Sequence, residues 1–328
     1  MMGLKQRDAD YCNLKFILIF LVVYGHLIEG RLEESLLFDQ IYRVIYAVHM
    51  PLFLFLSGFF MKGEAGCLRS ARQMFSYYAV LQAAIVMWAA LYSKGECSFF
   101  VPAWHLWYLL SLGCMAVVGF FWYRLIAYFP GADSPLVKLI VLSGAVLFAC
   151  AAGNIPSIGR FLSLSRTIVF LPYFLGGLFC PTGVSWKKYR FWGIAAFAWF
   201  GILYCTVGRY IPTAFFYQAD PYGAGLLIKG AACRLLCFLL GCSLGLFLLS
   251  FTTCRRVWFS KIGANTLTVY LLHAPLVKIF DRVRLPIEVF TCVSPFLAFY
   301  IIAFLYKASL WTGQMYAVRM TGRRDGGF

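Results

Sequence analysis

A lysine and a histidine stand eleven positions apart in the first apolar stretch of the chain, Lys15 and His26 in KFILIFLVVYGHLIEG (residues 15–30). Eleven residues make about three turns of an α-helix, so both side chains would lie on nearly the same face, roughly 16 Å apart along the axis. An ionisable group deep in a membrane span is costly to bury and usually marks a pathway or an active site. Histidine titrates near neutrality and suits general-base work. We therefore predict a functional role for His26, in line with a cation at one membrane surface.

Three further histidines are candidates for the same site. His49 in HMPLFLFLSGFF and His105 in AWHLWYLLSL are expected toward the outer face, and His273 in NTLTVYLLHAPL is expected near the middle of the membrane. Each of them could instead be structural, hydrogen-bonded between helices or to backbone freed by a nearby proline. Glu29, three residues after His26, could fix the tautomer of that imidazole. The sequence favours the other interpretation, a solvated charge at the outer end of the span.

Two arginines follow the second apolar stretch, Arg69 and Arg72 in MKGEAGCLRSARQMFSYY. Their i, i+3 spacing allows both guanidinium groups to share one helix face and to clamp a phosphate or a carboxylate. Ordinary positive-inside anchoring explains them equally well. Taken with Lys15, they suggest an anionic, elongated cytoplasmic ligand whose far end reaches His26. Acyl-CoA has that shape, with phosphates at one end and a thioester at the other.

The composition places the chain among integral membrane proteins. Hydrophobic residues make up 62% of the 328 residues and charged residues only 13%, about half the share of a soluble domain. The formal net charge of +16 would suggest nucleic acid in a soluble protein, but here the cations fall between apolar runs, so no nucleic-acid partner is expected. The twelve cysteines form no CxxC pair and have no histidine at ligand spacing, so we expect no metal site.

Hydropathy predicts about ten membrane-spanning helices in an all-α fold with a single domain over residues 1–328. Lysines and arginines gather in the even-numbered connections and at both ends of the chain, which predicts that both termini are cytoplasmic. The predicted spans cover residues 14–28, 44–61, 74–92, 104–123, 136–152, 166–180, 191–208, 224–250, 264–280 and 290–310.

Six phrases along the chain resemble the membrane acyltransferase 3 family, especially its branch of fucose 4-O-acetylase-like and exopolysaccharide O-acyltransferases. Lys15 and His26 fit the family's basic-x10-His signature, and Arg69 and Arg72 fall at its basic cytoplasmic motif, although with RxxR in place of RxR spacing. The remaining phrases that fit in order are HMPLFLFLSGFF, HLWYLLSL, LPYFLGGLF and IGANTLTVYLLHAPLV.

This resemblance implies that His26 is the catalytic residue and that Lys15, Arg69 and Arg72 bind acyl-CoA. The donor would be a co-substrate, usually acetyl-CoA, rather than a permanently bound cofactor. The acceptor would be a hydroxyl of a carbohydrate or glycolipid. The candidates on the acceptor side are His49, His105, Trp107, Arg234 and His273. Tyr46, Trp104, Tyr108 and Tyr217 could also face a sugar, although Trp and Tyr more often anchor a protein at the membrane interface. For Arg234, inside the eighth predicted span, a structural ion pair is the alternative.

The expected function is therefore O-acyl transfer to a cell-surface glycan by a multi-pass protein of the cell membrane, the inner membrane if the source is bacterial. His26 could act as a general base or could carry the acyl group, and the sequence does not choose between these routes. Self-association is left open. A transporter or flippase for a glycan or lipid-linked substrate is the alternative, because intramembrane His and Arg also suit a proton-coupled carrier; the missing internal repeat counts against it.

Overall fold

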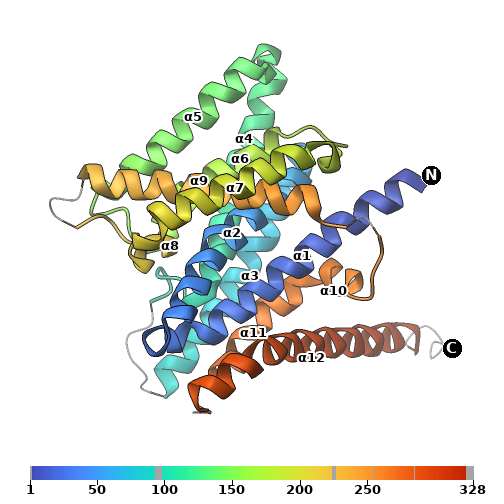
Figure 1. Ribbon diagram of the computed structural model, residues 1–328. Coiled ribbons are helices and arrows are strands. Elements are labelled where there is room, and N and C mark those ends of the chain that lie inside the picture. Colours follow the sequence, from blue (N-terminus) through green and yellow to red (C-terminus); the bar gives the residue numbers. More distant parts are fainter. Residues whose placement is uncertain (1, 93–97, 224–226, 254, 284, 323–328) are drawn as a thin grey trace. The chain divides into compact units, whose positions relative to one another are not determined.

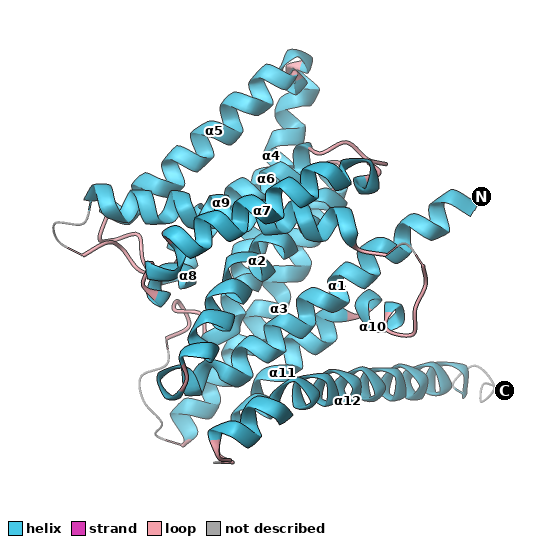
Figure 2. Cartoon of the chain, in the orientation of Figure 1, coloured by secondary structure: helices cyan, strands magenta, loops and turns pink. Residues whose placement is uncertain are grey.

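The computed structural model describes the backbone of residues 2–92, 98–223, 227–253, 255–283 and 285–322, and the side chains of residues 9–92, 98–223, 227–253, 255–283 and 285–311. Helices are the regular elements of these ranges, and Figure 2 shows no strand among them. Eight helices of the described residues are long and apolar enough to cross a membrane. The prediction of an all-α polytopic membrane protein is therefore confirmed.

Each of the ten predicted spans falls on a helix, but two of these helices are not among the eight that are long and apolar enough to cross. The seventh and ninth correspond to α7 (Arg190–Thr206) and α11 (Thr266–Phe280), with 17 and 15 residues. About 20 apolar residues are needed to cross the hydrocarbon core without thinning it. Ten crossings, and two cytoplasmic termini, therefore stay predictions. The eighth predicted span begins in residues 224–226, which lie outside the described part of the chain.

Figure 1 labels the helices of the chain, which divides into two compact units. Unit 1 comprises Met1–Ile45 and Thr252–Phe328, and unit 2 comprises Tyr46–Phe251. Helix α2 (Leu36–Phe60) contributes its first part to unit 1 and the remainder to unit 2. A single domain over the whole chain stays a prediction.

Unit 1 packs three helices from the C-terminal part of the chain against the first helix. The helix α1 (Met2–Ile28) contacts α10 (Ser260–Ala264), α11 and α12 (Ile287–Gly322). Asn13 fixes this arrangement, because its amide donates to the carbonyls of Thr253 (2.8 Å) and Arg255 (2.9 Å) and its oxygen accepts from Ser260. A buried amide in a membrane protein has to be satisfied in this way, since lipid offers no partner.

A buried arginine ties the connection after α1 to the connection after α11. Arg31 lies in the 3₁₀ helix η1 (Glu29–Glu34) and donates to the carbonyls of Leu285 (2.6 Å) and Val283 (3.2 Å). Its guanidinium also lies over the ring of Phe290, 4.4 Å from the centroid. The carbonyls and the aromatic face satisfy the cation where water is scarce.

Unit 2 contains the remaining long helices. Its principal packing pairs are α3 with α4, α4 with α6, α5 with α6, α5 with α9, and α7 with α9. Its α-helices, besides the second part of α2 and α7, are α3 (Glu64–Leu91), α4 (Trp107–Tyr128), α5 (Pro135–Ala151), α6 (Leu164–Phe179), α8 (Thr213–Tyr217) and α9 (Leu227–Phe251), and η2 (Trp104–Leu106) precedes α4.

Helices α2 and α6 cross with their backbones in contact. A side-chain carbon on Gly58 would collide with the carbonyl oxygen of Phe174, and one on Gly177 would collide with that of Phe55. Small residues at such a crossing are typical of membrane helices, because close backbone approach increases van der Waals contact. Next to the crossing, the ammonium of Lys62 donates to three carbonyls that end α6, those of Gly177, Leu178 and Cys180.

Candidate functional site

His26 lies in the last turn of α1 and contacts a carboxylate from the following turn. Its Nδ1 lies 3.0 Å from Oε2 of Glu29, and the two side chains are only 12% and 26% exposed. The interpretation of Glu29 as a solvated outer charge is therefore wrong. The physical reason is the end of α1 at Ile28, after which η1 turns the carboxylate back onto the imidazole. Because a carboxylate accepts from Nδ1–H, this contact favours the tautomer whose lone pair is on Nε2.

The structure brings His273, from α11, to His26. The two imidazole rings stack with their centroids 5.3 Å apart and their planes at 27°. His273 is fully buried, and its Nδ1 lies 2.7 Å from the carbonyl of Tyr270, to which it must donate. This nitrogen therefore bonds to the backbone of its own helix, and an acceptor-side role for His273 stays a prediction. We name the three residues His26, Glu29 and His273 the histidine site of unit 1.

The three predicted donor-binding cations fall in different units. Lys15 is half-buried on the same uninterrupted helix as His26, as the spacing predicts. Arg69 and Arg72 are both exposed near the start of α3 in unit 2. Their shared exposure is compatible with a phosphate clamp and with membrane anchoring, so donor binding by these residues stays a prediction.

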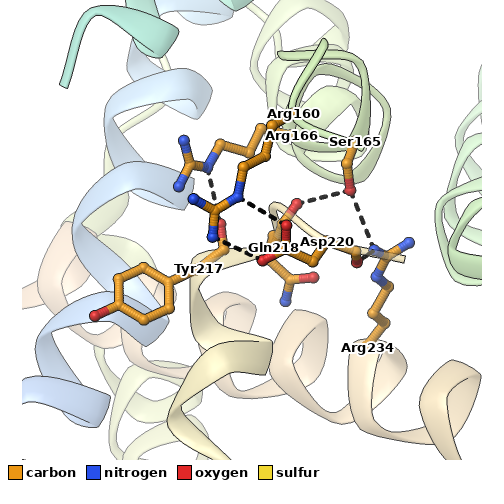
Figure 3. Close-up of polar contacts among 7 residues, drawn as sticks. All are labelled: Arg160, Ser165, Arg166, Tyr217, Gln218, Asp220 and Arg234. Atoms are coloured by element: carbon orange, nitrogen blue, oxygen red, sulfur yellow. Dashed lines mark hydrogen bonds and ion pairs between the residues drawn. The ribbon is translucent and has the colours of Figure 1, made fainter. Parts of the chain in front are cut away.

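Unit 2 contains a second polar site, where three arginines converge on residues 217–220 (Figure 3). Arg160 forms a bidentate pair with the carboxylate of Asp220, at 2.8 and 3.0 Å. Arg166, on α6, donates from Nε to the carbonyl of Tyr217 at 3.0 Å. Arg234, on α9, donates to the carbonyl of Asp220 at 3.0 Å. We name these three cations and residues 217–220 the arginine site.

Arg234 is the most deeply buried of these cations, at 3% exposed. Its guanidinium also donates to the carbonyl of Ala149 (3.2 Å) and to Oγ of Ser165 (3.1 Å), and it lies over the ring of Tyr222, 4.7 Å from the centroid. These acceptors are carbonyls, a hydroxyl and a ring, rather than the carboxylate that a structural ion pair requires.

Aromatic side chains continue from the arginine site. The Arg166 guanidinium lies 4.8 Å from the centroid of the Trp107 ring. Tyr217 meets Tyr46 edge to face at 5.4 Å, and Tyr46 meets His49 in the same way at 4.7 Å. The structure therefore brings two acceptor-side candidates, His49 and Trp107, to a common cluster with Arg166.

The other candidates are placed elsewhere. His105 is buried in η2, with its ring 5.9 Å from that of Trp104. Tyr108 is buried at the start of α4, and its hydroxyl lies 3.1 Å from that of Ser57. His273 belongs to unit 1, with His26.

Two hollows in unit 2 meet at Gln218 and Arg234. The first, of about 290 Å³, has a mostly apolar lining that includes Tyr46, Phe170 and Cys237. The second, also about 290 Å³ and open to solvent, is lined by Ala214, Phe215, Gln218, Asp220, Pro221, Tyr222 and Arg234. Both volumes include space that is open to solvent, so the enclosed part of each hollow is smaller.

The electrostatics of the arginine site follow from its contacts. Hydrogen bonds from Arg160 hold the pKa of Asp220 below its ordinary value, so this carboxylate is charged and acts only as an acceptor. Burial raises the pKa of Tyr222 to about 12, so its neutral hydroxyl donates to the carbonyl of Cys150 at 2.7 Å. No group of three or more His, Cys, Asp or Glu side chains with metal-binding geometry occurs among the described residues.

Sequence reasoning missed Arg160, Arg166, Gln218, Asp220 and Tyr222. Arg166 carried a usable signal, since it is an arginine among serine and threonine at the start of an apolar run. No sequence signal marks Gln218, because its burial depends on helices that are remote in sequence.

Comparison with known proteins supports an enzymatic interpretation. The acyltransferase 3 family, described as an acyltransferase domain, matches residues 11–307. The nodulation protein NolL of Sinorhizobium fredii (strain NBRC 101917 / NGR234) is 30% identical over 101 residues. That alignment spans 30% of this chain and only 28% of the relative's length. No solved structure matches the chain. Because the family match runs through nearly all of the predicted spans, the chain, a protein with eight helices long and apolar enough to cross a membrane among its described residues, belongs to the acyltransferase 3 family.

Proposed function

We propose that the protein is an O-acyltransferase that moves an acyl group, expected to be acetyl, from cytoplasmic acyl-CoA to a hydroxyl of a cell-surface carbohydrate or glycolipid. The cell membrane is the proposed location, and the lipid bilayer, acyl-CoA and the glycan are the proposed partners. Membership of an acyltransferase family counts against the transporter alternative.

The observation that carries this proposal is the 3.0 Å contact between Nδ1 of His26 and the carboxylate of Glu29. With Nδ1–H donating to Glu29, the lone pair of His26 is on Nε2. Nε2 can then take the proton of the acceptor hydroxyl while its oxygen attacks the thioester carbon. The C–S bond breaks, the new ester C–O bond forms, and the proton passes from Nε2 to the CoA thiolate. Glu29 would stabilise the imidazolium that exists between these steps.

The same nitrogen serves the second route, in which His26 carries the acyl group. Nε2 would attack the thioester carbon and CoA thiolate would leave; the oxygen of the acceptor hydroxyl would then displace the imidazole, and the hydroxyl proton would pass to the CoA thiolate. Both routes need a neutral imidazole with a fixed tautomer. Lys15, Arg69 and Arg72 are proposed to bind the phosphates of the donor, because cations at the membrane surface are suited to groups remote from the reacting thioester.

The test is transfer from radiolabelled acetyl-CoA to glycan acceptors by purified protein in lipid nanodiscs. His26→Ala should lower transfer by roughly 10²–10⁴-fold, the usual contribution of a general acid–base group. Retained melting temperature and membrane insertion would show that the variant is folded. More than about a tenth of wild-type activity in His26→Ala would exclude the assigned role.

A further inference from the structure

We propose that the second hollow of the arginine site binds one ring of the acceptor as a neutral, polyhydroxylated sugar, oriented by Gln218, Asp220 and Arg234. This inference rests on the proposed function, since it names the class of acceptor and the residues that hold it. The argument uses residues of unit 2 alone.

Gln218 is the observation that points to a ligand. Its side chain is 94% buried, yet Oε1 has no hydrogen-bond partner by geometry among the described residues. The side chain of Gln218 does form a hydrogen bond with the Cys237 thiol, but a thiol is only a weak donor and a weak acceptor. A buried acceptor without a good donor is destabilising, and such groups in native proteins usually have a role or a missing partner. The backbone of Gln218 is left-handed, at φ +54°, a conformation that side chains rarely adopt and that often occurs at functional sites.

The chemistry around this oxygen selects a hydroxyl. Gln218 Oε1 and the Asp220 carboxylate can only accept, whereas the guanidinium of Arg234 can only donate. A hydroxyl does both, so one sugar ring with neighbouring hydroxyls can satisfy acceptors and donor together. A ligand carboxylate at this position could pair with Arg234 but cannot donate, so it would leave Gln218 Oε1 without a donor and could not hydrogen-bond to the Asp220 carboxylate, whose charge Arg160 already offsets. The site therefore favours a neutral sugar over a uronic acid.

An aromatic wall completes the hollow. Phe215 and Tyr222 stack with their centroids 6.0 Å apart and their planes at 28°. Tyr222 is held in place, because its hydroxyl donates to the Cys150 carbonyl and its ring lies against Gly153 and Gly230, where any side-chain carbon would collide with it. The fixed ring of Tyr222, together with Phe215, gives the hollow an apolar wall against which the C–H bonds of a sugar can pack.

The experiment is saturation-transfer NMR of the full-length protein in nanodiscs, without acyl-CoA, using methyl glycosides of glucose, galactose, mannose and fucose and the methyl glycoside of glucuronic acid. We expect binding of at least one neutral glycoside, and weaker binding of the glucuronide than of the glucoside. Gln218→Asn keeps an amide and tolerates the left-handed backbone, but it withdraws the oxygen by one methylene, so affinity should fall at least tenfold. Asp220→Asn is the second variant and should also weaken binding.

Gln82→Asn is the matched control. Gln82 is a fully buried amide of unit 2 whose hydrogen bonds to Ser98, Val101 and Ala103 are all internal, so its loss should lower stability without changing sugar affinity. Absence of binding to every neutral glycoside, unchanged affinity in folded Gln218→Asn, or preference for the glucuronide would each overturn the proposal. Sugar binding without any acyl transfer would retain the site and reject the proposed function, so the two failures are distinguishable.

Discussion

Removal of the negative charge of Glu29 tests whether its contact with His26 supports catalysis. Glu29→Gln keeps the shape of the side chain but removes the negative charge that faces His26 Nδ1 at 3.0 Å. We expect kcat to fall by at least roughly 10²-fold with little change in the KM for acyl-CoA, because the charge matters most when the imidazolium forms. Steady-state kinetics check both values. Glu33→Gln, at an exposed position four residues further on, is the control, and an equal loss there would contradict the assignment.

Removal of the two exposed cations of α3 tests donor binding. Arg69→Ala with Arg72→Ala should raise the KM for acyl-CoA more than either single change and leave kcat nearly constant, since remote phosphate contacts bind ground and transition states alike. Lys187→Ala with Lys188→Ala removes two cations from another predicted cytoplasmic connection and should leave the KM unchanged. Equal effects of the two double variants on donor affinity, measured by calorimetry, would identify Arg69 and Arg72 as membrane anchors.

The pair of Arg160 and Asp220 gives the arginine site a defined pH response. The pKa of Asp220 is lowered in the folded protein, so its stabilising contribution is complete above the ordinary value of 3.8 and is lost as pH falls through the folded value. The melting temperatures of the wild type and of Asp220→Asn should therefore differ near neutral pH and become equal in acid. The difference at neutral pH should be small, because both side chains are about half exposed. A melting-temperature difference that grows below pH 3.8 would show that the pKa of Asp220 is not lowered in the folded protein.

The sequence predicts the residues of the histidine site unequally. Lys15 and His26 share one helix as their spacing requires, because helical register is a local property. The stacking of His273 on His26 joins α1 to α11, and no periodic pattern encodes which distant helix packs on which. The interpretation of Glu29 from sequence is wrong for a related reason. The position of its carboxylate depends on where α1 ends, and a helix end in apolar sequence has no strong local signal.

The crossing of α2 and α6 depends on two glycines and can be tested as a unit. Gly58→Ala and Gly177→Ala each force a methyl group into a backbone carbonyl of the facing helix, so each should lower the melting temperature and the yield of folded protein. Gly201→Ala in α7 is the control, because nothing lies within 4 Å of the added carbon. Its effect should be neutral or stabilising, since alanine favours the helix. Equal behaviour of the three variants would show that α2 and α6 do not approach so closely.

Helix positions could be predicted from hydropathy, whereas helix lengths could not. Helix α2 begins at Leu36 rather than near residue 44, and α1 begins at Met2 rather than near residue 14. Hydropathy detects only the apolar part of a helix. The helix can continue beyond that part through turns with polar side chains, which lie in water and keep their backbone hydrogen bonds. Of the arginine site, only Arg234 and Tyr217 are sequence-based candidates; the other members could not be predicted, since residues 217–220 have no regular pattern and their positions depend on contacts with α6 and α9.

The predicted orientation of the chain makes the two substrates approach from opposite sides. With both termini cytoplasmic, Arg69 and Arg72 face the cytoplasm and the connection at residues 209–225 lies outside, its last two residues being beyond the described part of the chain. In sealed vesicles of known orientation, acyl-CoA should protect Ser70→Cys from an impermeant thiol reagent, and acceptor sugar should protect Ala214→Cys. The twelve native cysteines must first be replaced. Donor protection at Ala214→Cys alone would reverse the topology.

Unit 1 is built from both ends of the chain, and this has a consequence for biosynthesis. Asn13 of α1 finds its carbonyl partners 240 and 242 residues later, at Thr253 and Arg255, and His26 meets His273 later still. During translation, α1 is therefore made long before the connection between α9 and α10 whose carbonyls accept from its amide. A nascent chain arrested before residue 252 would contain the whole of unit 2 and, of the histidine site, His26 and Glu29 without His273. The histidine site is therefore completed only once α11 has been made, among the last events of synthesis.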